Sequence, residues 1–166
     1  MPTTLADMAG AVALLLKARN ETVAVSESST GGLIAAALLA VPGASAYFMG
    51  GGVIYTHRAR EALLRVRLDA HPGMRPSTEP YALLSATAVR DLLGTTWGVG
   101  ETGATGPAGN RYGDAAGHSC IAVCGPVTRS ITLETGRSDR EENMWRFARE
   151  ALGLFEGVLR DRPPAG

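Results

Sequence analysis

Three adjacent hydroxyl side chains and two glycines follow a short apolar segment near the start of the chain and could bind an anion. Residues 25–33 read VSESSTGGL. A strand that leads directly into a helix leaves the first backbone N–H groups of that helix without partners, and glycines let an anion approach them closely. The segment therefore predicts a phosphate or carboxylate site. A well-capped helix start that binds nothing has the same pattern, so both interpretations stay open.

Three further polar or glycine-rich segments fall where predicted strands end. They are residues 42–45 with the glycines 50–52, residues 55–60 (YTHRAR) and residues 102–107 (TGATGP). In open α/β sheets a ligand lies beyond the carboxyl ends of the parallel strands. We therefore expect these segments to converge with residues 28–32.

Two side chains near these segments could supply charge or move a proton. Arg140 falls in the first turn of a predicted helix, where the helix macrodipole disfavours a cation, so an anion would compensate it. An ion pair with Asp139 or Glu142 is the alternative. Histidine titrates near neutral pH, which suits His57 for proton transfer. A simple helix-start residue is the other interpretation of His57.

Length and composition restrict the class of protein. The chain has 166 residues, of which 45% are hydrophobic, so we expect one domain over residues 1–166, with a core over about 5–158 and a tail at 161–166. Sixteen basic residues balance sixteen acidic ones, which disfavours nucleic acid and anionic membranes as partners. No segment is apolar enough to span a bilayer or to act as a secretory signal, so we expect a cytoplasmic protein.

The cysteines and histidines indicate no metal site. Cys120 and Cys124 lie four residues apart in one apolar segment, so they share a strand face, too far apart to form a disulfide. Free core thiols are the expectation. His57, His71 and His118 are scattered without metal-ligand spacing. We expect neither a metal nor a cofactor.

The hydrophobic pattern alternates between helical and strand periods. Helices are predicted over residues 3–19, 33–39 and 58–66. A fourth helix is predicted to start within residues 77–80, with a buried stripe of Tyr81, Leu84, Ala88 and Leu92. A last helix is predicted to begin at Ser138, which forms a capping box with Glu141, and to bury a stripe of Met144, Ala148, Ala151, Phe155 and Val158. Strands are predicted over 22–26, 51–55, 97–101, 118–123 and 128–134, with a hairpin across 125–126 and a loop over 102–117. The order predicts a three-layer α/β/α single domain with a mixed, mainly parallel sheet.

Five motifs in one order resemble the CinA C-terminal domain family, also called competence/damage-inducible proteins or nicotinamide-nucleotide amidohydrolases. The motifs are ESSTGG at 27–32, PGASAYF at 42–48, VIY at 53–55, TGATGP at 102–107 and DR at 139–140. The resemblance covers roughly residues 5–158 with similar spacing. No single motif identifies the family, whereas all five motifs in the same order and with similar spacing do.

The resemblance implies an α/β/α domain that forms a homo-oligomer. Active members hydrolyse the amide of nicotinamide mononucleotide to nicotinate mononucleotide and ammonia without a metal, by a mechanism resembling serine amidases with a Ser-Lys pair. The family's serines and tyrosine correspond to Ser28, Ser45 and Tyr55. Some members carry an N-terminal metal-dependent pyrophosphatase domain, for which we expect no room in this chain.

The chain departs from the family pattern at the catalytic lysine. Arg60 stands at that place, and the only lysine is Lys17, outside every motif. Arginine stays protonated in proteins, so Arg60 cannot act as the neutral base of a Ser-Lys pair. Ala44 and Gly50 also stand where the family usually has a serine and an arginine.

Three functions therefore stay open. The first is an amidohydrolase on a nicotinamide nucleotide or related phosphate-bearing amide, with Ser28 or Ser45 as nucleophile and Tyr55 or His57 handling the proton. The second is a module that binds a nucleotide or phosphate and has lost hydrolysis. The third is a hydrolase whose substrate lacks the nucleotide, with residues 110–112 reshaping specificity.

The candidate site residues fall into two groups. The expected catalytic residues are Ser28, Ser45, Tyr55, His57 and Arg60. The expected substrate-binding residues are Ser29, Thr30, Gly31, Gly32, Gly51, Thr102, Gly103, Thr105, Gly106 and Arg140. The substrate's phosphate would rest on the N–H groups from Thr30 to Gly32 or near Thr105, with Arg140 supplying charge.

Overall fold

The computed structural model describes residues 3–162, and residues 163–166 of the predicted tail lie outside that part. The α-helices are α1 (Leu5–Arg19), α2 (Leu33–Ala40), α3 (His57–Ala59), α4 (Glu79–Leu93) and α5 (Arg140–Asp161), with short turns η1 (Ala44–Ala46), η2 (Arg60–Leu64) and η3 (Leu68–Ala70). The strands are β1 (Val23–Glu27), β2 (Phe48–Val53), β3 (Trp97–Ala104), β4 (His118–Cys124) and β5 (Arg129–Glu134).

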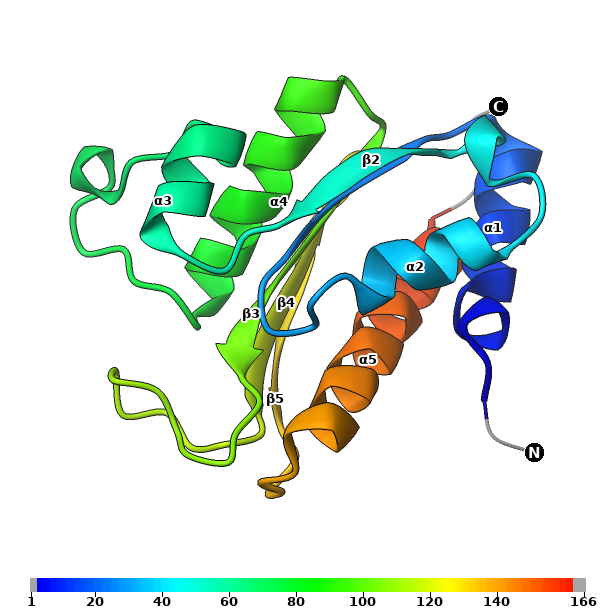
Figure 1. The fold of residues 1–166 in the computed structure, drawn as a ribbon. Helices are drawn as coiled ribbons and strands as arrows, with labels where there is room; N and C mark the ends of the chain where they lie inside the picture. Colours follow the sequence, from blue (N-terminus) through cyan, green and yellow to red (C-terminus); the bar gives the residue numbers. More distant parts are fainter. Residues whose placement is uncertain (1–2, 163–166) are drawn as a thin grey trace.

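The five strands form one mixed sheet in the order β2-β1-β3-β4-β5. The strands β2, β1 and β3 run parallel, whereas β4 and β5 are antiparallel and form the predicted hairpin. Helices α1, α2 and α5 cover one face, and α3 and α4 cover the other (Figure 1). The prediction of a three-layer α/β/α domain is confirmed.

The central strand β1 is buried along its whole length because helices cover both of its faces. Its neighbour β2 is an edge strand that approaches it very closely. A Cβ at Gly51 would lie 2.3 Å from the backbone oxygen of Val25, so only glycine fits there. The glycines 50–52 are thus part of the strand, and the predicted strand over 51–55 was wrong at both ends.

The strand β3 continues through Thr102 and Gly103 to Ala104, three residues beyond its predicted end. Antiparallel pairing with β4 extends it, because Ala104 pairs with His118. The polar loop therefore starts at residue 105 and not at residue 102. Thr102 and Gly103 are held by the sheet.

Two helix predictions need correction. Leu92, predicted to be buried on α4, is exposed, because α4 packs its small residues Ala82 and Ala86 against the sheet. The N-cap of α5 is Asp139, whose side chain accepts a hydrogen bond from the N–H of Glu142, whereas Ser138 was predicted. Most of the predicted core stripe of α5 is buried, and Met144 is half-buried.

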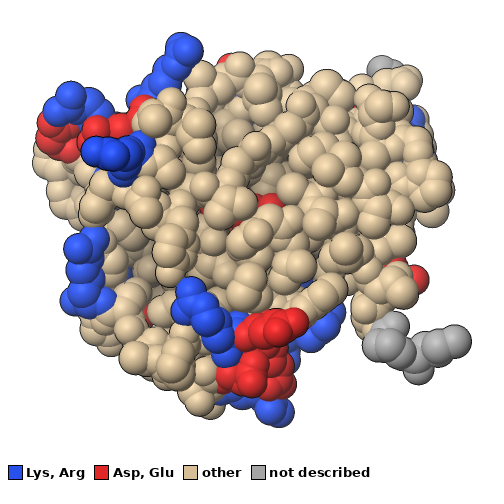
Figure 2. Space-filling model, in the orientation of Figure 1, with Lys and Arg blue, Asp and Glu red and all other residues tan. Residues whose placement is uncertain are grey.

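Basic and acidic side chains both appear on the surface (Figure 2), in agreement with the balanced composition. Basic and acidic side chains lie mainly along the left and lower margins of the face seen in Figure 2. Cys120 and Cys124 are buried free thiols, as predicted. None of the helices within residues 3–162 has the length and hydropathy needed to cross a membrane.

Candidate functional site

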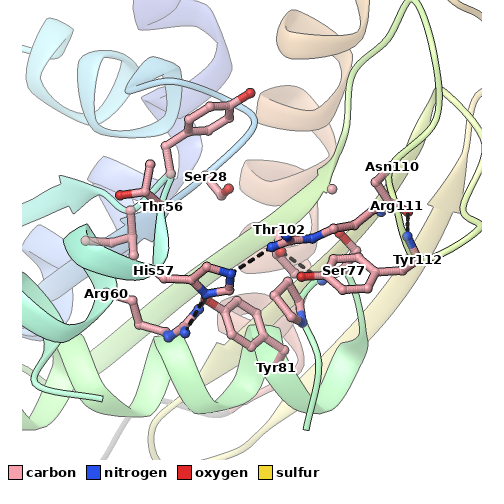
Figure 3. A pocket seen from close by; sticks show the side chains of 14 residues that line it. Ser28, Thr56, His57, Arg60, Ser77, Tyr81, Thr102, Asn110, Arg111 and Tyr112 are labelled. Carbon is pink, nitrogen blue, oxygen red and sulfur yellow. Dashed lines mark hydrogen bonds between the residues drawn. The ribbon is translucent and has the colours of Figure 1, made fainter. Parts of the chain in front are cut away.

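A cavity of about 380 Å³ lies where β1, β2 and β3 end, a size typical of small-molecule sites. The loop after β1, the start of α3, the start of α4 and the loop 105–117 surround it (Figure 3). Its lining residues are Ser28, Ile54, Tyr55, Thr56, His57, Arg60, Pro76, Ser77, Tyr81, Thr102, Gly103, Asn110, Arg111 and Tyr112. Three of the four predicted segments thus converge here.

The N-terminus of α2 is occupied by the protein's own carboxylate. The backbone N–H groups of Gly32, Ile34 and Ala35 donate to Glu27 at 3.2, 2.9 and 2.8 Å. Glu27 is only 1% exposed. An external phosphate therefore does not find free N–H groups at the start of this helix, which corrects the predicted phosphate position at Thr30 to Gly32.

A second buried carboxylate, Glu101 of β3, organises the hydroxyl loop. It accepts hydrogen bonds from the N–H groups of Ser28 and Thr30 at 3.0 and 3.1 Å. The hydroxyls of Ser29 and Ser119 also donate to it. Ser29 and Thr30 are thus buried structural residues, and Ser28 is the hydroxyl of this loop that lines the cavity.

The two carboxylates face one another through a single hydroxyl. Thr30 Oγ1 lies 2.7 Å from Glu27 and 2.9 Å from Glu101. Burial raises the pKa of Glu27, its hydrogen bonds oppose that rise, and the charge of Glu101 adds to it. Glu27 ends β1 and Glu101 lies within β3, and sequence reasoning missed the role of both residues. A carboxylate placed directly after buried residues was the available signal.

Three basic side chains line one side of the cavity and are called the row: His57, Arg60 and Arg111. Thr56 caps α3, and the chain then passes without a break into the single π-helical turn η2. Such turns occur frequently at functional sites. His57 and Arg60 are three positions apart and therefore project on the same side.

Arg60 and Arg111 approach opposite nitrogens of the His57 ring (Figure 3). Nη2 of Arg60 lies 2.8 Å from Nδ1, and Nη2 of Arg111 lies 2.7 Å from Nε2. Arg60 is 4% exposed and also donates to the hydroxyl of Tyr81 at 3.3 Å. Its buried Nε has no partner within residues 3–162.

A smaller hollow of about 180 Å³ adjoins the cavity and shares Tyr55, Gly103 and Asn110 with it. Arg140 lines this hollow. Its guanidinium donates to the backbone oxygen of Gly106 at 2.6 Å and to the hydroxyl of Tyr55 at 3.2 Å. Among the described residues 3–162, neither Asp139 nor Glu142 forms the alternative ion pair with Arg140, and Glu142 pairs with Arg137 instead.

The remaining predicted binding residues lie around or away from the two hollows. The adjoining hollow is lined by Ser29, Thr105 and Gly106 as well as Arg140. Gly31 and Gly32 lie in the turn before α2 and line neither hollow. Gly51 lies within β2 against β1, not in either hollow.

The structure does not bring Ser45 to the cavity. Ser45 is exposed in η1, just before β2. The first residue of β2 pairs with Val23 and its last with Glu27, so Ser45 and Ser28 lie at opposite ends of a strand about 16 Å long. The prediction that the segment 42–45 joins the site was wrong for a single copy of the chain.

Several cavity residues had no sequence signal. Ser77 and Tyr81 belong to the start of α4, which looked like an ordinary capped helix. Arg111 lies in an irregular loop, where only a change of specificity was expected from residues 110–112. Across residues 3–162, the acidic, histidine and cysteine side chains form no group of three or more that could hold a metal ion.

Sequence comparison relates the chain to a bacterial family. Residues 5–159 match the family model described as the CinA C-terminal domain. A CinA-like protein of Anaeromyxobacter sp. (strain K) is 39% identical over 145 residues, which cover 87% of this chain and 36% of that protein. A CinA-like protein of Prochlorococcus marinus (strain MIT 9313) is 39% identical over 119 residues, which cover 72% of this chain and 28% of that protein. The chain thus spans about a third of such relatives.

Solved structures have the same fold. The competence damage-inducible protein A from Klebsiella pneumoniae subsp. pneumoniae MGH 78578 superimposes with a TM-score of 0.89 at 25% identity, covering 96% of this chain and 99% of that one. The competence/damage inducible protein CihA from Agrobacterium tumefaciens gives a TM-score of 0.86 at 25% identity, covering 96% and 98%. The fold and the family match together show that this chain belongs to the CinA C-terminal domain family.

Proposed function

We propose that this chain is an amidohydrolase that cleaves the carboxamide of nicotinamide mononucleotide or a related phosphate-bearing amide. The observation that carries the proposal is the position of Ser28. Its backbone N–H is bonded to Glu101 at 3.0 Å, and its side chain lines the same cavity as His57 and Tyr55 (Figure 3). A nucleophile, a proton carrier and a hydroxyl donor therefore share one hollow.

The chemistry assigns one step to each of these groups. The Oγ of Ser28 attacks the carboxamide carbon, while His57 takes the hydroxyl proton and passes it to the leaving nitrogen, so that ammonia departs. Water then cleaves the acyl ester, which releases the carboxylate product and restores the hydroxyl. Tyr55 accepts a hydrogen bond from Arg140, so its O–H stays available to donate to the developing oxyanion.

Ammonia release from nicotinamide mononucleotide tests the proposal. We expect turnover by the wild type and a loss of about a thousandfold or more in Ser28→Ala, because the nucleophile is removed. Ser45→Ala compares the second candidate serine, and we expect it to keep wild-type activity because Ser45 is exposed at the far end of β2. Full activity in Ser28→Ala would reject Ser28 as the nucleophile.

A second candidate function is binding without hydrolysis. It is favoured by Arg60, which cannot act as a base, and by the guanidiniums at both ring nitrogens of His57. Arg60→Lys discriminates between the two functions. Ammonia release that appears only in this variant, with ligand binding already present in the wild type, would support the binding module and reject the amidohydrolase.

A further inference from the structure

We propose that His57, Arg60 and Arg111 form an oxyanion site that holds the phosphate group of the ligand. The inference rests on the proposed function for the class of substrate, but the site itself is defined by its chemistry and does not require turnover. It places the phosphate on the α3 side of the cavity, not at the start of α2 and not beside Arg140.

The hydrogen-bond roles in the row cannot all be satisfied by the protein. A neutral imidazole has one N–H donor and one acceptor nitrogen, and an imidazolium has two donors and no acceptor. A guanidinium offers donors only. Both ring nitrogens of His57 face a guanidinium nitrogen, at 2.8 and 2.7 Å. At least one of these contacts therefore sets donor against donor, and an acceptor placed between the groups would resolve it.

The row also has no counter-charge. The fourteen residues that line the cavity include His57, Arg60 and Arg111 but no aspartate or glutamate. None of the three basic side chains belongs to an ion pair within residues 3–162. Arg75, at the edge of the same region, shows the usual solution, because it contacts Asp114 at 2.8 Å. A buried cation left unpaired is unfavourable, so the site is completed by an anion.

The arrangement suits an oxyanion with several acceptor atoms. The buried Nε of Arg60 has no partner among the described residues, and guanidiniums bind phosphate oxygens through paired N–H groups. The rings of Tyr81 and Tyr112 lie 5.8 and 5.3 Å from the guanidiniums of Arg60 and Arg111. These contacts hold the two cations in place before a ligand arrives.

The position of the row agrees with a substrate that reaches across the cavity. Ser28 comes from the loop after β1, whereas the row comes from α3, η2 and the loop 105–117, and both line the same hollow (Figure 3). A phosphate bound at the row would draw the guanidiniums toward its oxygens. One ring nitrogen of His57 would then be free to accept a proton.

Calorimetric titration with inorganic phosphate at constant ionic strength tests the site. Arg111 is exposed in a loop, so Arg111→Gln removes its charge without disturbing the core. We expect this variant to bind phosphate at least about tenfold more weakly than the wild type. Arg58→Gln is the matched control, since Arg58 is an exposed arginine of α3 that does not line the cavity, and we expect its affinity to stay within about twofold.

Arg140→Gln tests the competing position in the adjoining hollow, and we expect its phosphate affinity to match that of the wild type. Wild-type affinity in Arg111→Gln, or a loss of binding confined to Arg140→Gln, would overturn the inference. A wild type that does not bind phosphate at about 10 mM would overturn it as well.

A local readout separates the site from a general charge effect. Nitrogen NMR of the three histidines follows each ring, and we expect phosphate to shift the ring nitrogens of His57 but not those of His118. Failure of the two proposals can be told apart. Phosphate binding that depends on Arg111 without ammonia release would retain the site and reject hydrolysis, whereas ammonia release with Arg111-independent phosphate binding would reject the site alone.

Discussion

Two histidines of this protein are surrounded in opposite ways. His118, at the start of β4, has the carboxylate of Glu134 at Nδ1 and the backbone oxygen of Ser77 at 2.8 Å from Nε2. Both ring nitrogens therefore face acceptors. His57 has a guanidinium at each nitrogen. The acceptors at the two ring nitrogens of His118 come from the protein itself. The ring of His57 has no such acceptor from the residues that contact it, so an external acceptor could bind there.

The two rings also differ in the charge of their surroundings: carboxylates lie near His118, and none lines the cavity at His57. Burial disfavours the protonated form of His118, but the hydrogen bonds to Glu134 and Ser77 and the charge of Asp114 outweigh it, so the pKa of His118 is raised. No carboxylate lines the cavity around His57. From this difference we propose different roles for the two rings: His118 stabilises the fold, and His57 belongs to the proposed phosphate site.

Replacement of His57 gives the largest expected effect in this comparison. In His57→Ala we expect ammonia release to fall about a hundredfold to ten-thousandfold, because the proton carrier is lost. Stability should stay within about 0.5 kcal/mol of the wild type, since His57 is exposed and leaves no acid unpaired. Steady-state kinetics and urea unfolding measure the two quantities. A variant that keeps activity but unfolds easily would reverse the assignment.

Replacement of His118 should produce the opposite result. In His118→Ala the backbone oxygen of Ser77 loses its donor and Asp114 loses a nearby cation. We expect the free energy of unfolding to fall by about 1–3 kcal/mol, while Kd for phosphate changes little in the folded protein. Urea denaturation checks the first value and calorimetry the second. Unchanged stability would contradict a structural role.

The raised pKa of His118 predicts a pH dependence with a definite sign. A histidine with a raised folded pKa binds its proton more tightly in the folded state, so its contribution is complete below the unfolded value near about 6.5. The contribution is lost as pH rises through the folded pKa. The difference in Tm between wild type and His118→Gln should therefore shrink as pH rises from about 6 to 9. A growing difference would contradict the sign.

The smallest expected effect is the difference in stability between variants of two arginines, Arg75 and Arg111. Arg75→Gln removes an ion pair with Asp114, and we expect it to lower stability by about 0.5–1 kcal/mol. Arg111→Gln removes a cation with no acidic partner among the described residues, so stability should be unchanged or slightly higher. Thermal unfolding of the two variants measures both stability changes. Equal losses would remove the distinction between paired and unpaired arginines.

The sequence was sufficient to predict the layers and part of the site. Apolar periodicity located the strands and helices that flank Ser28, His57 and Thr102, and the rule for parallel strands placed these three residues at one edge of the sheet. The same rule misplaced Ser45, because residues 42–45 come before β2, at its amino end, and not at the carboxyl end of a strand. Its position depends on the register of β2 against β1.

Other features depended on contacts between distant segments. The N–H groups around Thr30 looked free because their partners, Glu27 and Glu101, lie in strands that seemed purely structural. Arg111 lies fifty-four positions from His57 in a loop without periodicity, so no local pattern links the two. Buried carboxylates and irregular loops are where local sequence reasoning is weakest.

A crystal structure of the protein grown with nicotinamide mononucleotide would show directly which side chains bind the ligand's phosphate. We expect the ligand's phosphate within hydrogen-bond distance of the guanidiniums of Arg60 and Arg111, with one of the two guanidiniums moved away from the His57 ring. A phosphate bound beside Arg140, or at the start of α2, with the two guanidiniums still against His57, would contradict it.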